Sequence, residues 1–259
     1  MEQTVLIERT GEIATVTMNR PDARNALSRQ LGADLLTALT DLSRDEQLRA
    51  LILTGAGERA FCAGADLIER RTLTSAELTT HTESINAVCD ALAGFPVPTF
   101  AAIRGFALAG GAELAIACDL RIAGEDAVLG FPEVKIGVFP GAGGVVRLPR
   151  LVGAGAARDL RYTGRKVAAD EALRIGLVDR IVPSAQVLAV ARALADEIAA
   201  NAPLAVRAVK RALMESSGLA ESDAHRVVAR HRRPLDATAD YEEGLAAFAE
   251  RRRPAFRGE

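Results

Sequence analysis

The chain has 259 residues, of which 49% are hydrophobic and 25% charged, so it can bury a full core as one large globular domain. Its formal net charge is −2 and its early basic residues are scattered, which argues against the broad cationic face that nucleic-acid binding requires. The three cysteines, Cys62, Cys89 and Cys118, have no CxxC spacing, so we expect neither a disulfide framework nor a metal site.

The first residues lack a basic start followed by an apolar stretch and a cleavage site, so no signal peptide is expected. No apolar run reaches the length of a membrane span. We therefore expect a cytoplasmic protein with no membrane or nucleic-acid partner.

Strands and helices alternate along the first part of the chain. Runs rich in β-branched residues at 5–9 and 13–18 predict a hairpin. Ser28 and the Thr74/Glu77 pair are typical helix caps, and each precedes apolar residues at helical spacing. Further short apolar runs predict buried strands at residues 50–55, 99–104, 119–123 and 178–182. This order predicts an α/β domain with a largely parallel sheet.

Beyond about residue 184 the pattern changes to helices without strands, which continue to about Ala249. Such a tail packs either on its own core or on a neighbouring subunit, and the sequence leaves both open. The tail also concentrates arginines, which form either a solvated helix face or a local anion pocket: Arg226, Arg230, Arg232, Arg233, Arg251, Arg252, Arg253 and Arg257.

Two glycine-containing turns, at residues 59–67 and 105–113, each follow a predicted strand. Ligands of α/β sheets bind outside the carboxyl ends of the strands, so both turns can present backbone N–H groups to one crevice. Two such donors aimed at one oxygen form an oxyanion hole, and the small residues Ala63 and Gly110 permit a close approach. Either turn alone is better explained as a tight connection from strand to helix, and only the two together with Glu113 favour a site.

Two carboxylates accompany these turns. Glu113 falls in the first turn of an apolar helix that begins near Gly110, and Glu133 follows Pro132. Each has an ordinary structural explanation, as a residue that compensates a helix dipole or starts a helix. The apolar neighbours of Glu113 weigh against a solvated face. The pair beside two donor turns indicates acid–base chemistry on a polarised carbonyl.

Other motifs are weaker. Residues 140–144 look like a phosphate loop, but no Gly-Lys-Ser/Thr follows, so they more readily start a helix. No GxSxG occurs, and His81, His225 and His231 fall on predicted solvent-side or tail helices, which leaves no nucleophile–histidine pair. Cys62 is best explained as a small buried thiol.

Taken in order, several segments closely resemble the crotonase family, and specifically its enoyl-CoA hydratases: residues 18–27, 59–67, 110–115, 131–133, 136–144, 168–178, 243–248 and 251–256. The resemblance runs nearly end to end. It implies an α/β fold with a spiral of ββα turns over residues 1–195. It also implies a C-terminal helical region, residues 196–259, that forms homotrimers or hexamers and completes the acyl-CoA pocket.

The resemblance further implies an acyl-CoA thioester as substrate, with no cofactor, because coenzyme A is part of that substrate. The amides of Ala63 and Gly110 would hold the thioester oxygen, while Glu113 and Glu133 divide the proton work as water adds to the 2,3 double bond. Coenzyme A contacts carry over to Arg24, Ala26, Ala65, Asp66, Leu67, Arg251 and Phe256.

Three alternatives stay open. Isomerases of the family generally keep only the position of Glu133, whereas this chain keeps both acids. Arg232 and Asp236 stand where aromatic residues are typical, which indicates either a polar or specialised acyl group or a rearranged surface helix. A non-catalytic protein that binds acyl-CoA or RNA is the third, although the charge balance and the intact acid pair argue against it.

Overall fold

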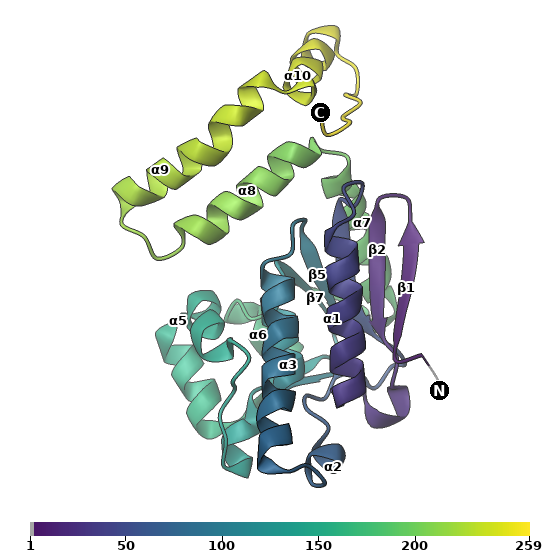
Figure 1. Ribbon diagram of the computed structural model, residues 1–259, viewed down its shortest axis with the longest axis vertical. Helices are drawn as coiled ribbons and strands as arrows, with labels where there is room; N and C mark the ends of the chain where they lie inside the picture. Colours follow the sequence, from purple (N-terminus) through teal and green to yellow (C-terminus); the bar gives the residue numbers. More distant parts are fainter. Residues whose placement is uncertain (1–2) are drawn as a thin grey trace.

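Two β-sheets and the helices around them form the core of the protein, seen in a computed structural model that describes residues 3–259 (Figure 1). Residues 1–2, at the start of the segment expected to lack a signal peptide, lie outside the described residues. The large sheet has the order β1 (Val5–Thr10), β2 (Ile13–Met18), β3 (Ala50–Gly55), β5 (Thr99–Ile103), β7 (Leu120–Gly124) and β10 (Arg180–Val182). The small sheet has the order β4 (Ala60–Cys62), β6 (Phe106–Leu108), β8 (Val128–Gly130) and β9 (Lys166–Ala168).

The chain visits the two sheets in turn. From β3 to α5, a strand of the large sheet is followed by a short strand of the small sheet and then by a helix, which is a ββα spiral; in the last part of the core, β9 of the small sheet and α6 precede β10 of the large sheet. The pairs β2–β3, β3–β5, β5–β7 and β7–β10 are parallel, and β1–β2 is an antiparallel hairpin. The predicted hairpin, the parallel sheet and the spiral are therefore confirmed.

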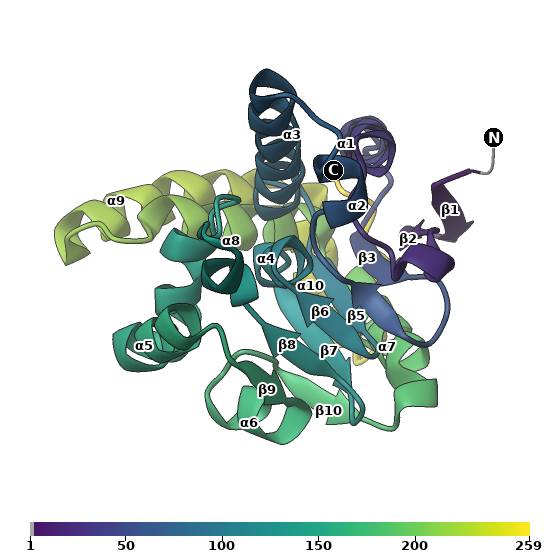
Figure 2. The same ribbon diagram turned by 90° about the horizontal axis from the view of Figure 1, so that it is seen from below.

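Helices cover both faces of the large sheet, as its continuous apolar strands require. The core as a whole contains α1 (Arg29–Ser43), α2 (Leu67–Arg70), α3 (Ser75–Ala93), α4 (Gly110–Ala117), α5 (Gly144–Thr163), α6 (Ala169–Arg174) and α7 (Val187–Ala199). Along β3, Leu51 and Leu53 pack in the cluster that includes α1 and α3, whereas Ile52 packs with α7 on the other face. In Figure 2, α4 lies between α3, α5 and the strands of the small sheet.

The helix caps are those that the sequence predicts. Ser28 Oγ accepts a hydrogen bond from the Leu31 N–H at 3.1 Å at the start of α1. Thr74 and Glu77 form a reciprocal capping box at the start of α3. Each cap satisfies amides that the first helical turn leaves without partners, and so fixes where the helix begins.

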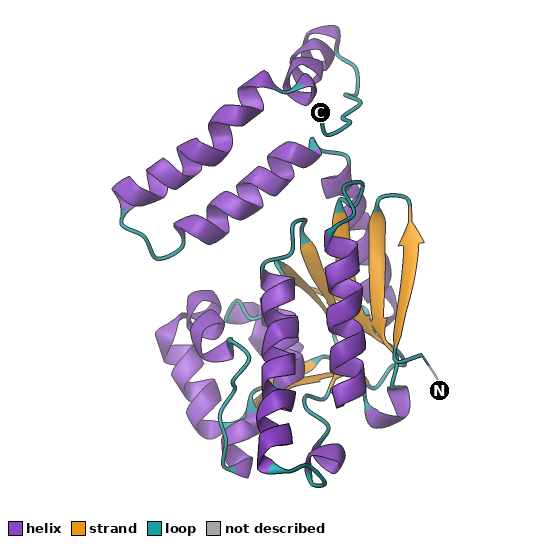
Figure 3. Ribbon diagram, in the orientation of Figure 1, coloured by secondary structure: helices purple, strands orange, loops and turns teal. Residues whose placement is uncertain are grey.

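The last helices form an arm that projects from the core (Figure 1). The arm comprises α8 (Pro203–Ser216), α9 (Glu221–Arg232) and α10 (Ala239–Glu250), and contains no strand (Figure 3). Helix α7 crosses residue 195 without a break and packs on β3, β5 and β7; the division at 195/196 stays a prediction. Lys210 of α8 anchors the arm, because its Nζ lies 2.9 Å from Val97 O and 2.6 Å from Asp119 Oδ2. Among the described residues, no helix is long and apolar enough to cross a membrane.

Candidate active site

The two glycine turns meet in the core. A Cβ on Gly64 would lie 2.8 Å from Ala109 Cβ and 3.2 Å from Gly110 N, and one on Gly111 would lie 2.1 Å from Cys62 O. Side chains at these two glycines would therefore collide with the opposite turn. Ala109, at the start of α4, has φ 51° and ψ −126°, a conformation that alanine rarely adopts and that costs on the order of 1–3 kcal/mol. Strain of this kind is typical of functional sites.

The two predicted oxyanion donors differ in their hydrogen bonding. The Gly110 N–H begins α4 and has no hydrogen-bond acceptor among residues 3–259, as expected for a first helical turn. The Ala63 N–H donates to Arg24 O at 3.0 Å. A ligand oxygen that binds both donors must therefore share the Ala63 N–H with Arg24 or displace that bond.

Glu113 and Glu133 lie in one buried environment, and their pKa values are shifted in the same direction. Burial raises the Glu113 pKa, opposed by the N–H of Gly144, which donates to Oε1 at 2.9 Å, and by the charge of Arg161. Burial also raises the Glu133 pKa, to about 7, and the charge of Glu113 adds to this rise. Within residues 3–259, neither Glu133 carboxylate oxygen has a hydrogen-bond partner. The two acids therefore differ in their surroundings: the Gly144 N–H and the charge of Arg161 oppose the rise in the Glu113 pKa, whereas no hydrogen bond from a neighbouring residue within residues 3–259 stabilises the Glu133 carboxylate.

Arg161 is a third member of this cluster, and the sequence analysis missed it. It lies on the buried face of α5, is 8% exposed, and its guanidinium stacks over the Phe131 ring at 4.7 Å. Its charge acts on both acids. The sequence contains one indication of this role: Arg161 falls on the same face of α5 as the buried apolar residues Ala157 and Leu160.

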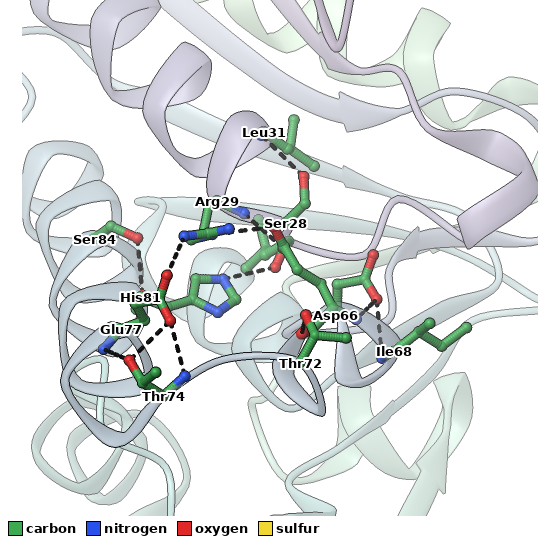
Figure 4. A network of polar contacts seen from close by, with 12 residues as sticks. Ser28, Arg29, Leu31, Asp66, Ile68, Thr72, Thr74, Glu77, His81 and Ser84 are labelled. Atoms are coloured by element: carbon green, nitrogen blue, oxygen red, sulfur yellow. Dashed lines mark hydrogen bonds and ion pairs between the residues drawn. The ribbon is translucent and has the colours of Figure 1, made fainter.

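The predicted coenzyme A loop is also assembled. The Leu27 N–H donates to Gly64 O at 2.8 Å and the Asp66 N–H donates to Leu27 O at 3.0 Å, which brings the segment of Arg24 and Ala26 beside that of Ala65 and Leu67. Arg24 and Leu67 are exposed. The Asp66 carboxylate is already engaged, because it caps α2 (Figure 4) and also pairs with Arg20 at 3.0 Å.

His81 corrects one expectation. The sequence predicts it on a solvent-side helix, but it is 1% exposed, because α3 is covered by α1 and α4. Its Nε2–H donates to Leu27 O at 2.9 Å and so ties α3 to the loop that contains Arg24 and Ala26 (Figure 4). Cys62 is fully buried, and burial raises its pKa to about 12, which confirms an unreactive thiol.

Within one chain, the tail residues that are predicted to contact coenzyme A are not brought to Glu113 and Glu133. Arg251 ends α10, and Phe256 follows it and packs near Gly244; both belong to the arm (Figure 1). Arg232 and Asp236 form an ion pair with each other at 2.5 Å, and both side chains are about half exposed.

Four of the eight arginines concentrated in the tail form ion pairs with neighbouring acids in the part of the chain that the structure describes. Arg226 pairs with Asp223, Arg230 with Glu215, and Arg252 with Glu243 and Glu250. These pairs favour the solvated helix face over the anion pocket.

Comparison with known proteins assigns the family. The family model described as enoyl-CoA hydratase/isomerase matches residues 8–259. A Bacillus subtilis (strain 168) protein whose name places it among enoyl-CoA hydratases/isomerases is 45% identical over 249 residues, 95% of each chain. The short-chain-enoyl-CoA hydratase of Clostridium acetobutylicum is 39% identical over 249 residues, 96% of this chain and 95% of its own. The crystal structure of an enoyl-CoA hydratase from Bacillus anthracis is similar with a TM-score of 0.98 and 40% identity, covering 99% of this chain and 100% of that chain. The protein therefore belongs to the enoyl-CoA hydratase/isomerase, or crotonase, family.

Proposed function

We propose that the protein is an enoyl-CoA hydratase that reversibly adds water to the 2,3 double bond of an acyl-CoA thioester. The observation that carries the proposal is the buried pair of Glu113 and Glu133, which differ in their hydrogen-bond partners and lie in the core with the Gly110 amide, which has no acceptor within residues 3–259. Hydration transfers no electrons between redox partners, so the reaction needs no redox cofactor, and the proposed chemistry uses no metal.

The proposed mechanism divides the proton transfers between the acids. Ionised Glu113 takes a proton from water as the water oxygen attacks C3. The electron pair of the double bond moves onto the thioester oxygen, where the N–H groups of Gly110 and Ala63 stabilise the enolate charge. Neutral Glu133 then delivers its proton to C2, and proton exchange with solvent restores the starting state. Glu113 suits the first role because the Gly144 N–H stabilises its anion, and Glu133 suits the second because its pKa is about 7.

Coenzyme A is proposed to bind along the loop of Arg24 and Ala26 and the facing segment of Ala65, Asp66 and Leu67. Arg24 contributes charge, and Ala65 and Leu67 contribute backbone groups. Because Asp66 pairs with Arg20 and caps α2, we propose that it also supports the structure of this loop. Arg251 and Phe256 would reach a ligand only from the arm of a neighbouring subunit.

The arm supports a homotrimer or a hexamer as the proposed assembly. Leu213 of α8 is 69% exposed and Phe248 of α10 is 86% exposed. A groove of about 460 Å³ between α8 and α9 is lined mainly by apolar residues, among them Val209 and Val228. Large apolar side chains exposed together on one element are typical of an interface between subunits.

A panel of thioesters tests the proposal against isomerisation. Wild-type protein, Glu113→Gln and Glu133→Gln are compared on a 2-enoyl-CoA, scored for incorporation of labelled water, and on a 3-enoyl-CoA, scored for migration of the double bond. A hydratase requires both acids, so each variant loses roughly 10²- to 10⁴-fold in water addition. Double-bond migration that survives Glu113→Gln, without water addition by the wild type, would instead identify an isomerase.

The same variants test the non-catalytic alternative. Near-native turnover in both variants would contradict the mechanism. Absence of any turnover by the wild type, together with tight acyl-CoA binding, would indicate a binding protein.

A further inference from the structure

Arg161 is a buried cation without a hydrogen-bonding partner of its own. Its Nε, Nη1 and Nη2 atoms are buried and make no hydrogen bond within residues 3–259. Burying a guanidinium this way is costly, and a methionine or leucine would fill the same space without that cost. Packing against Phe131 alone therefore does not explain why the chain places a charge here.

The position of Arg161 relates it to both acids. A Cβ on Gly144 would lie 2.7 Å from Arg161 Nη2 and 2.6 Å from Glu113 Oε1. The distance between Arg161 Nη2 and Glu113 Oε1 therefore cannot exceed the sum of these two distances. The guanidinium also stacks on Phe131, two residues before Glu133. No direct ion pair joins Arg161 to either carboxylate among the described residues, so both acids keep oxygens available to a substrate.

The charges around this cluster are few. Glu113 comes from α4 and Glu133 from the 3-10 turn Pro132–Ile136. Arg147, near the start of α5, also lowers the pKa of Glu113 by its charge, but it pairs with the exposed Asp90 of α3 at 2.6 Å, which offsets part of that charge. Cys89 of α3 is buried, and its pKa lies well above the usual value, so it contributes no charge. Within residues 3–259, Arg161 is then the cation of this cluster that has no ion-pair partner, and it is neutral together with the two acids when a single proton is shared between the acids.

We propose that Arg161 is a positioning residue that sets the number of protons in the site: its fixed charge keeps Glu113 ionised without bonding to it, which leaves one proton, on Glu133. The inference rests on the proposed function, because it explains how an apolar site supplies a base and an acid together. Without Arg161, both acids would favour their neutral forms. Glu113 would then not be ionised at the pH values at which Glu133 is protonated, and the site would lack its base.

The test measures the carboxyl groups directly. The pKa values of Glu113 and Glu133 are followed by ¹³C NMR of protein labelled at glutamate carboxyl carbons, with Glu113→Gln and Glu133→Gln used for assignment. The variants are Arg161→Met and Arg161→Gln, which remove the charge, and Arg161→Lys, which keeps it. Arg158→Met is the matched control, because Arg158 is an exposed arginine of the same helix.

We expect both carboxyl pKa values to rise by about one unit or more in Arg161→Met and Arg161→Gln, to remain near the wild-type values in Arg161→Lys, and to be unchanged in Arg158→Met. The pH profile of kcat/KM on a 2-enoyl-CoA is expected to move to higher pH by the same amount. A merely structural role would lower the melting temperature or the activity at every pH without moving these values.

Carboxyl pKa values within about 0.3 unit of wild type in folded Arg161→Met or Arg161→Gln would overturn the inference. If Arg161→Met does not fold, Arg161→Gln and Arg161→Lys decide the question by the same titration. Because the titration needs no turnover, it also separates this inference from the proposed function: shifted carboxyl groups in a protein that hydrates nothing would support the first and reject the second.

Discussion

Replacing Gly144 with alanine tests the geometry of the acid pair. The backbone of Gly144 does not require glycine, but the added Cβ would lie 2.6 Å from Glu113 Oε1 and 2.7 Å from Arg161 Nη2, closer than real contacts allow. Both side chains must move. The Gly144 N–H also donates to Glu113 Oε1 at 2.9 Å, and this bond weakens or breaks when the carboxylate is displaced.

The size of the effect follows from that bond. A hydrogen bond to a charged group contributes about 1.5–3 kcal/mol. Because about 1.4 kcal/mol corresponds to a tenfold change in rate, Gly144→Ala is expected to lower kcat/KM for hydration by roughly 10- to 150-fold. The N–H also lowers the pKa of Glu113, so the acidic limb of the pH profile moves to higher pH in the variant.

The assay is the loss of absorbance of the conjugated thioester, measured from pH 5 to 9 and accompanied by a melting curve. Gly155→Ala is the matched control, because Gly155 lies in the same helix and a Cβ there meets nothing within 4 Å. Gly155→Ala is expected to keep wild-type activity. A folded Gly144→Ala variant with kcat/KM within about twofold of wild type, or an equal loss in Gly155→Ala, would refute the reasoning.

Three further outcomes are expected. Hydration declines as pH rises through about 7, because Glu133 must be protonated to deliver its proton; a kcat/KM profile that is flat across this range contradicts the assignment. Lys210→Met lowers the free energy of unfolding by about 2 kcal/mol, because it removes the partner of Asp119 and a bond to Val97 O; denaturant titration measures this, and an unchanged midpoint contradicts the anchoring role. Phe248→Asp shifts the protein toward smaller species in analytical ultracentrifugation, because it places a charge on an exposed apolar position; an unchanged sedimentation coefficient argues against an interface at α10.

Several parts of the fold that the sequence predicted depend on local interactions. The Ser28 cap, the capping box at Thr74 and the hairpin of β1 and β2 each involve residues close together in the chain, and each has a recognisable residue pattern. The strands of the small sheet were not predicted from the residues. Each has three residues, too few to show a period, and their pairing depends on how the large sheet positions the turns between them.

The residues of the candidate site show the same contrast between local patterns, which the sequence reveals, and contacts between distant segments, which it does not. Glu113 and the Gly110 turn could be predicted because their small and apolar neighbours belong to the same short segment. The burial of His81 could not, because it arises from α1 and α4, which are distant in sequence. Arg161 is the more instructive case: an arginine on an amphipathic helix is usually a surface residue, and only the stacking of α5 on Phe131 and Glu133 makes it part of the site. A charge that costs stability where it lies is better explained by what it does to its neighbours than by the fold it belongs to.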